Sequence, residues 1–173
     1  MWRGNEEIIL LIHGWESNSS RWKKLLPYLL PLGKTIIAID APAHGLSSGK
    51  EFSAPKYAEY INVVTQKYQP KLLIGHSIGG GAIACYLNKY NDLSVQKVIL
   101  LGSPSDFKLL NNNYVALLSL NAKVKILLEK YIQEKFNIHL DDFKGHLFAE
   151  NFSQKALIAH DIDDKIVLVE EGK

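Results

Sequence analysis

Five short apolar segments, separated by more polar stretches, organise the chain. They cover Ile8–Ile12, Thr35–Ile39, Lys71–Gly75, Lys97–Leu101 and Ala156–His160. Each segment is continuously apolar rather than alternating, which is typical of strands covered on both faces in a parallel sheet. The pattern therefore predicts a mostly parallel sheet of about five strands.

The segments between these strands have helical spacing of their apolar residues. The predicted helices are one that carries Trp22 and is capped by Ser19 or Ser20, one over Lys56–Lys67 and one over Ile78–Asn88. Strands that alternate with helices form right-handed crossover units, so we predict a doubly wound α/β fold. The length of 173 residues fits a single domain over residues 1–173.

The alternation breaks between Asp106 and Asn151, where helical stretches follow one another without a strand. The clearest is Val124–Phe136, whose apolar stripe consists of Val124, Leu127, Leu128, Tyr131 and Ile132. An amphipathic helix of this kind either covers the core or forms a lid over a substrate pocket. Its place in the chain favours a helical lid region over residues 106–151.

Composition and charge exclude several classes of function. The net charge is only +2, from 20 basic and 18 acidic residues, and gives no reason to expect nucleic acid as a partner. Cys85 is the single cysteine, so no intrachain disulfide can form and no cysteine-based metal site is suggested. The start lacks the pattern of a signal peptide, and no apolar run is long enough to span a membrane. We expect a cytoplasmic protein without a metal or cofactor.

The strongest chemical signal is Gly75-His76-Ser77-Ile78-Gly79, which lies between a predicted strand and a predicted helix. This is the context of a nucleophile elbow, a sharp turn that exposes the serine hydroxyl. Glycine at 75 and at 79 removes side chains that would collide in so tight a turn. The motif predicts that Ser77 is a nucleophile.

A second motif, His13-Gly14-Trp15, follows the first strand. Acyl transfer needs two preorganised backbone N–H groups for the negative oxygen of the tetrahedral intermediate. One is expected from Ile78, the residue after the nucleophile, and the other from Trp15. The side chain of His13 is expected to be structural rather than a catalytic base.

In these motifs the chain resembles the α/β-hydrolase superfamily, close to its bacterial esterase-like members. A third motif, Asp40 to Ser47, resembles the family's D-x-P-G-H-G-x-S loop, with Ala43 in place of a glycine. That loop is structural in the family, so Asp40 and His44 are given no catalytic role. The resemblance implies a serine hydrolase of the carboxylic ester hydrolase type, acting on an ester or related acyl bond of a small molecule.

The resemblance also implies a catalytic acid. Residues Asp161 to Val167 are similar to the family's G-x-x-D-x-x-V pattern, and on that alignment Asp164 is the acid of the triad. Asp163 is a second candidate. Asp106, just after the fourth strand, is the alternative used by some members.

The base is not identified, because no histidine follows Asp164. In the family it lies after one further strand and helix, so we expect this chain to be truncated at both ends relative to the family and to lack the catalytic histidine. His76 is expected to point away from the site, and His139 and His146 lie in the lid region. The alternative to an enzyme is an inactive hydrolase fragment or a binding module.

Truncation has a physical consequence for the sheet. The strands Thr35–Ile39 and Ala156–His160 would lie at its edges without neighbours, and unprotected apolar edges pair with other chains. We therefore predict self-association through these edges. A histidine supplied by another chain is a third, weaker hypothesis.

Overall fold

The computed structural model describes residues 1–136, 139–151 and 153–172, and its centre is a five-stranded parallel sheet. The strands are β1 (Asn5–Ile12), β2 (Lys34–Ile39), β3 (Leu72–His76), β4 (Lys97–Leu101) and β5 (Lys155–Ala159). Their order across the sheet is β2-β1-β3-β4-β5, and every neighbouring pair is parallel. The predicted sheet and α/β fold class are confirmed.

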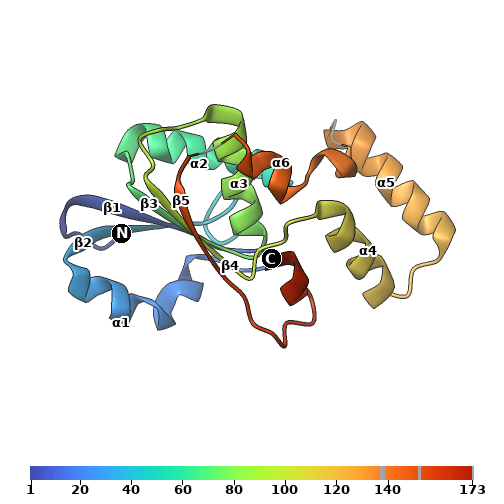
Figure 1. Cartoon of the computed structure of the whole chain (residues 1–173), viewed down its shortest axis with the longest axis horizontal. Coiled ribbons are helices and arrows are strands. Elements are labelled where there is room, and N and C mark those ends of the chain that lie inside the picture. Colours follow the sequence, from blue (N-terminus) through green and yellow to red (C-terminus); the bar gives the residue numbers. More distant parts are fainter. Residues whose placement is uncertain (137–138, 152, 173) are drawn as a thin grey trace.

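Helices cover both faces of the sheet and make three layers (Figure 1). One face carries α2 (Ala54–Tyr68), α3 (Ile78–Tyr90) and α6 (Gly145–Ala149). The other carries the 3-10 helix η1 (Ser19–Lys24), α1 (Leu26–Leu29) and the 3-10 helix η2 (Leu30–Leu32). Successive side chains of β1 to β4 alternate between the two layers, so the central residues of these strands are apolar on both faces. We call the cluster on the second face, which includes Trp22, the α1-face cluster.

The first helical segment differs from its prediction. Neither Ser19 nor Ser20 is the cap: the side chain of Asn18 accepts the Ser20 N–H at 2.9 Å. The segment is broken into short 3-10 and α-helical pieces instead of one helix. Pro27 and Pro31 lack the N–H that a continuous helix needs.

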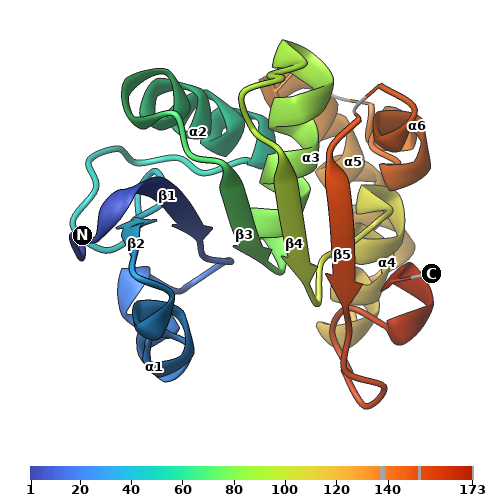
Figure 2. The ribbon, with the colours of Figure 1, turned by 60° about the vertical axis from the view of Figure 1, so that its left-hand side comes forward.

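The chain between β4 and β5 is helical, with α4 (Phe107–Leu117), α5 (Ala122–Phe136), the 3-10 helix η3 (Leu140–Asp142) and then α6. Figure 1 shows α4 and α5 beside the sheet rather than on it, and Figure 2 shows them behind β5. The alternative in which α5 covers the core does not hold, because none of its described side chains is buried and Leu127 is exposed. Residues 137–138 of the predicted lid region lie outside the described residues.

The two edges of the sheet differ. At the β2 edge, Trp2 forms an antiparallel bridge with Ile36, with reciprocal N–H···O hydrogen bonds of 2.9 Å. The prediction of a bare edge at Thr35–Ile39 is therefore wrong in part. Along β5, all five residues are exposed.

Candidate active site

Ser77 lies in the sharp turn between β3 and α3. Its backbone has φ 52° and ψ −130°, a conformation that residues with a Cβ rarely adopt. Its N–H donates to the carbonyl of Leu101 at 2.9 Å, which fixes the turn against the end of β4. The turn has no room for side chains at its glycines: a Cβ on Gly75 would lie 2.7 Å from Gly80 Cα, and one on Gly79 only 2.4 Å from the Ile12 carbonyl oxygen.

The loop after β1 lies directly against this turn. A Cβ on Gly14 would lie 2.9 Å from the Cβ of Ser77, so only glycine allows this approach. The next residue, Trp15, has an exposed side chain. Within the described part of the chain, the backbone N–H groups of Trp15 and Ile78 donate no hydrogen bond to another protein group. Two unpaired donors therefore flank Ser77.

His13 is buried and holds the loop after β1 in place through hydrogen bonds of its ring. Its Nε2 accepts the Ala41 N–H at 2.9 Å, so the ring proton is assigned to Nδ1, which donates to the Gly14 carbonyl at 2.7 Å. Burial lowers the pKa of His13, which keeps the ring neutral. Both ring nitrogens are occupied, and His13 has no lone pair left for catalysis.

Asp40 and His44 join neighbouring loops. The Asp40 carboxylate accepts the N–H groups of Ser19 at 2.6 Å and Leu46 at 2.9 Å. Burial raises the pKa of Asp40, but these hydrogen bonds outweigh it and hold the pKa below its usual value. His44 donates from Nδ1 to the Pro42 carbonyl, and its Nε2 accepts the N–H of the residue after Trp15 at 3.2 Å. These contacts agree with the structural roles expected for both residues.

His76 is held by a residue that sequence reasoning did not single out. The guanidinium of Arg21, on η1, lies 2.7 Å from His76 Nε2. Because guanidinium only donates, Nε2 is the acceptor and the proton of the neutral ring is on Nδ1. Burial, helped by the Arg21 charge, lowers the pKa of His76 to about 4. His76 is neutral at pH 7 but has no free lone pair for the proton of Ser77.

The loop after β5 brings Asp164 to the same end of the sheet. Its Oδ1 accepts the N–H groups of Ile166 at 2.9 Å and Val167 at 3.0 Å. Its Oδ2 lies 3.5 Å from the position of a Cβ on Gly102, just beyond β4, and accepts no hydrogen bond within the described residues. Asp163 is exposed, and only its backbone N–H is engaged in the loop.

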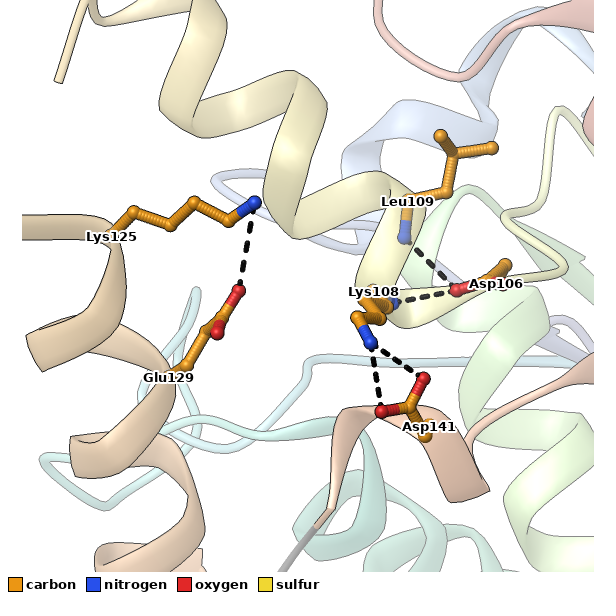
Figure 3. Close-up of polar contacts among 6 residues, drawn as sticks. All are labelled: Asp106, Lys108, Leu109, Lys125, Glu129 and Asp141. Carbon is orange, nitrogen blue, oxygen red and sulfur yellow. Dashed lines mark hydrogen bonds and ion pairs between the residues drawn. The ribbon is translucent and has the colours of Figure 1, made fainter. Parts of the chain in front are cut away.

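Asp106, the alternative acid, lies at the start of α4 and caps this helix (Figure 3). Its Oδ1 caps α4 by accepting the N–H groups of Lys108 at 2.8 Å and Leu109 at 2.9 Å. The Lys108 ammonium contacts both oxygens of Asp141 at 2.8 Å and joins α4 to η3. Within α5, the half-buried Lys125 and Glu129 form an ion pair at 3.9 Å. Asp106 and Asp164 therefore each use Oδ1 for two backbone N–H groups, Asp106 at the start of α4 and Asp164 in the loop after β5.

A cavity of about 560 Å³ opens above Ser77. Its lining includes Trp15, Phe52, Ser77, Ile78, Phe107, Leu110, Tyr114, Leu117, Ile132, Leu140, Phe143 and Ile166. Most of these side chains are apolar, and many come from α4, α5 and η3. Glu16 and Lys165 are the charged side chains of the lining, and no motif pointed to either residue. Asp164 is adjacent in the chain to Lys165 but does not itself line the cavity.

None of the six histidines, all of which the structure describes, lines this cavity. His139 Nε2 lies 3.3 Å from the amide nitrogen of Gln133, His146 is exposed on α6, and His160 donates to the Val167 carbonyl at 2.7 Å. The residues that the structure describes contain no group of three His, Cys, Asp or Glu side chains placed to hold a metal. None of their helices is long and apolar enough to cross a membrane.

The fold agrees with the similarity of this chain to known proteins. The sequence model of the alpha/beta hydrolase fold family matches residues 7–168, and the chain belongs to that family. A serine hydrolase-like protein of Danio rerio is 37% identical over 99 residues, 54% of this chain and 30% of its own length. Its counterpart in Homo sapiens is 32% identical over 102 residues, 56% of this chain and 49% of its own length. The aligned segments thus span under half of these relatives.

Solved structures show the same fold over nearly the whole chain. An esterase from Exiguobacterium antarcticum superposes with a TM-score of 0.69 at 20% identity, covering 98% of this chain and 78% of its own. A monoacylglycerol lipase from Paleococcus ferrophilus gives 0.71 at 21% identity, with coverage of 98% and 79%.

Proposed function

We propose that this chain carries the nucleophile of a serine hydrolase that acts on an ester or related acyl bond of a small molecule. The observation that carries the proposal is Ser77, which is held in a strained turn and opens into an apolar cavity. Ser77 Oγ attacks the acyl carbon as a base takes its proton, and the tetrahedral intermediate collapses to an acyl-enzyme while that proton passes to the departing alcohol. Water then hydrolyses the acyl-enzyme, which releases the acid and regenerates the Ser77 hydroxyl. The names of the curated relatives support this class of reaction.

Stabilisation of the oxyanion is assigned to the backbone N–H groups of Trp15 and Ile78. Both lie beside Ser77 and are unpaired among the described residues, so they are available without first breaking another hydrogen bond. Preorganised donors of this kind are worth about 3–4 kcal/mol each in transition-state stabilisation. Gly75, His76 and Gly79 hold the turn and do not contact the substrate.

The role assigned to Asp164 is to orient and stabilise a protonated imidazole. Its Oδ2 is free, whereas its Oδ1 is occupied by the loop. The imidazole itself is not provided by any histidine in the cavity lining. Turnover therefore requires a base that none of the placed side chains provides, and we expect slow chemistry from this chain alone.

The cavity supports an apolar acyl group as the bound part of the substrate. Its volume lies within the usual range for small-molecule sites, and its walls are mostly aliphatic and aromatic. Residues 106–151, which contain α4, α5 and η3, are proposed to form the lid of this cavity. The exposed apolar side chains of α5 fit a helix that contacts ligand or solvent rather than the core.

Labelling with a fluorophosphonate tests the assignment directly. We expect the purified chain to be labelled slowly and Ser77→Ala not at all, with circular dichroism showing that both are folded. Imidazole in the buffer should accelerate labelling by replacing the base, and Asp164→Asn should weaken that acceleration. A folded chain that is not labelled even with imidazole would contradict the proposal.

Ligand binding without turnover is the second candidate, and the cavity's lack of a histidine favours it. A fluorescent fatty acid should then bind the chain and the Ser77→Ala variant equally well. Leu110→Arg puts a charge into the cavity wall. It should abolish binding both in the otherwise unchanged chain and in the Ser77→Ala variant. Binding without labelling would select this candidate over the hydrolase.

A further inference from the structure

The segment that carries Trp15 is held on both sides by histidine side chains. Nδ1 of His13 donates to the Gly14 carbonyl at 2.7 Å, and Nε2 of His44 accepts the Glu16 N–H at 3.2 Å. A peptide group is planar and trans, so its C=O and N–H point in opposite directions. The Gly14 carbonyl shares its peptide plane with the Trp15 N–H. A bond that fixes this carbonyl therefore also fixes the direction of the Trp15 N–H.

The two histidines come from different loops, and each holds the backbone of the other's loop. His13 lies in the loop after β1, and its Nε2 accepts the N–H of Ala41, in the loop after β2, at 2.9 Å. His44 lies in the loop after β2 and accepts from Glu16, in the loop after β1. The centroids of the two rings are 5.7 Å apart. Neither loop can move without breaking a hydrogen bond to the other, and we call His13 and His44 the histidine pair.

The backbone of Glu16 needs such a restraint because it lies in the left-handed region, with φ 49°. A residue with a Cβ rarely adopts this conformation and keeps it only where neighbouring groups hold it. The His44 ring is itself fixed: Nδ1 donates to the Pro42 carbonyl at 2.8 Å, which leaves Nε2 as the acceptor for Glu16. The ring also packs edge-on against Trp15 and Phe52 of the cavity wall, with centroid distances of 5.3 and 4.9 Å.

We propose that the histidine pair aims the Trp15 N–H at the oxyanion that forms on Ser77. This inference rests on the proposed function, in which that N–H is one of the two oxyanion donors. A Cβ on Gly14 would lie 2.9 Å from the Ser77 Cβ, so the peptide plane between Gly14 and Trp15 lies beside the nucleophile. A misplacement of about 1 Å at such a site can cost on the order of 100-fold in rate. Neither histidine lines the cavity, and both are positioning residues that act through the backbone.

Two substitutions of His44, which is half-buried whereas His13 is fully buried, separate its hydrogen bond from its ring. His44→Gln keeps an acceptor near the position of Nε2 but loses the ring, and His44→Phe keeps the ring but has no acceptor. Fluorophosphonate labelling with imidazole present gives the affinity for the reagent and the rate constant of the bound reagent.

We expect His44→Phe to lower that rate constant by about 10–100-fold at unchanged affinity, and His44→Gln to stay within about threefold of the native chain. Urea denaturation of each variant provides the folded fraction to which the rates are referred. A slow His44→Gln beside a native-like His44→Phe would overturn the proposal, because the ring would then act by packing. Equal rate constants for the two variants would also overturn it.

NMR tests the histidine pair without any chemistry at Ser77. Residual dipolar couplings report the direction of an N–H bond, and His44→Phe should change the Trp15 coupling while His44→Gln preserves it. Amide exchange at Glu16 should be faster in His44→Phe only. An unchanged Trp15 coupling in His44→Phe would overturn the inference, even if labelling slowed. A native chain that is not labelled would instead contradict the proposed function, and a changed coupling would still show that His44 sets the direction of this N–H.

Discussion

Replacing Ser77 with glycine should stabilise the protein while removing the nucleophile. The backbone of Ser77, at φ 52° and ψ −130°, is strained for any residue with a Cβ. Strain of this kind costs about 1–3 kcal/mol. Glycine relieves it, although glycine's extra freedom in the unfolded chain costs about 0.5–1 kcal/mol relative to alanine. Ser77→Gly should therefore be more stable than Ser77→Ala by about 0.5–2 kcal/mol.

Urea denaturation of the two variants measures this difference. Both lack Oγ, so the comparison isolates the effect of the Cβ on the strained turn. In thermal melts a difference of about 1 kcal/mol corresponds to roughly 2–4 °C for a chain of this size. Ala84→Gly, within α3, is the matched control and should lose about 1 kcal/mol because its backbone is helical.

The sign of the difference decides the outcome. If Ser77→Gly is equal to or less stable than Ser77→Ala, the turn is not strained and the nucleophile-elbow argument fails. The expected sign would show that the chain retains a serine at 77 at the expense of its own stability, which is typical of functional sites.

Three further predictions concern residues around the site. Asp40→Ala should lower the free energy of unfolding by about 1–3 kcal/mol, since two backbone N–H groups lose their acceptor, while labelling per folded molecule stays unchanged. In the folded chain the pKa values of His13 and His76 lie below the ordinary value of 6.5. As the pH falls from 6.5 toward about 4, the unfolded chain therefore binds more protons than the folded chain. Stability should decrease through that window, and His76→Gln should flatten the decrease in urea titrations at a series of pH values. Asp106→Ala should cost about 1 kcal/mol and speed amide exchange in α4 without affecting Ser77 labelling; a loss of labelling would return Asp106 to the list of catalytic acids.

Most of the sheet could be predicted because the central residues of β1 to β4 are apolar on both faces, and β5 has the same apolar pattern although its residues are exposed. The helical segments were less predictable at their ends. Asn18 caps the first one because its side chain reaches the Ser20 N–H, and nothing in the local pattern separates Asn18 from its two serine neighbours. The apolar stripe of α5 indicated a buried face, but burial depends on what the rest of the chain brings against it.

The sequence by itself determined the residues of the turn, because at those positions only one type of side chain fits the geometry or the chemistry. Glycines at 75 and 79 mark the turn because a Cβ there would collide with the backbone, and Ser77 follows from that context. For the catalytic acid, the sequence left three candidates, Asp164, Asp163 and Asp106. The tertiary structure places Asp164 beside Gly102 at the end of β4 and Asp106 at the start of α4, and each uses its Oδ1 for two backbone N–H groups.

Only the tertiary structure decided the contacts between distant segments. The pairing of Arg21 with His76, 55 residues apart, leaves the elbow histidine without a free lone pair. Trp2 bridges Ile36 at one edge of the sheet, whereas all five residues of β5 at the other edge are exposed. Periodicity and motif spacing report on neighbours along the chain, whereas these contacts depend on which loops the parallel crossovers bring to the same end or edge of the sheet.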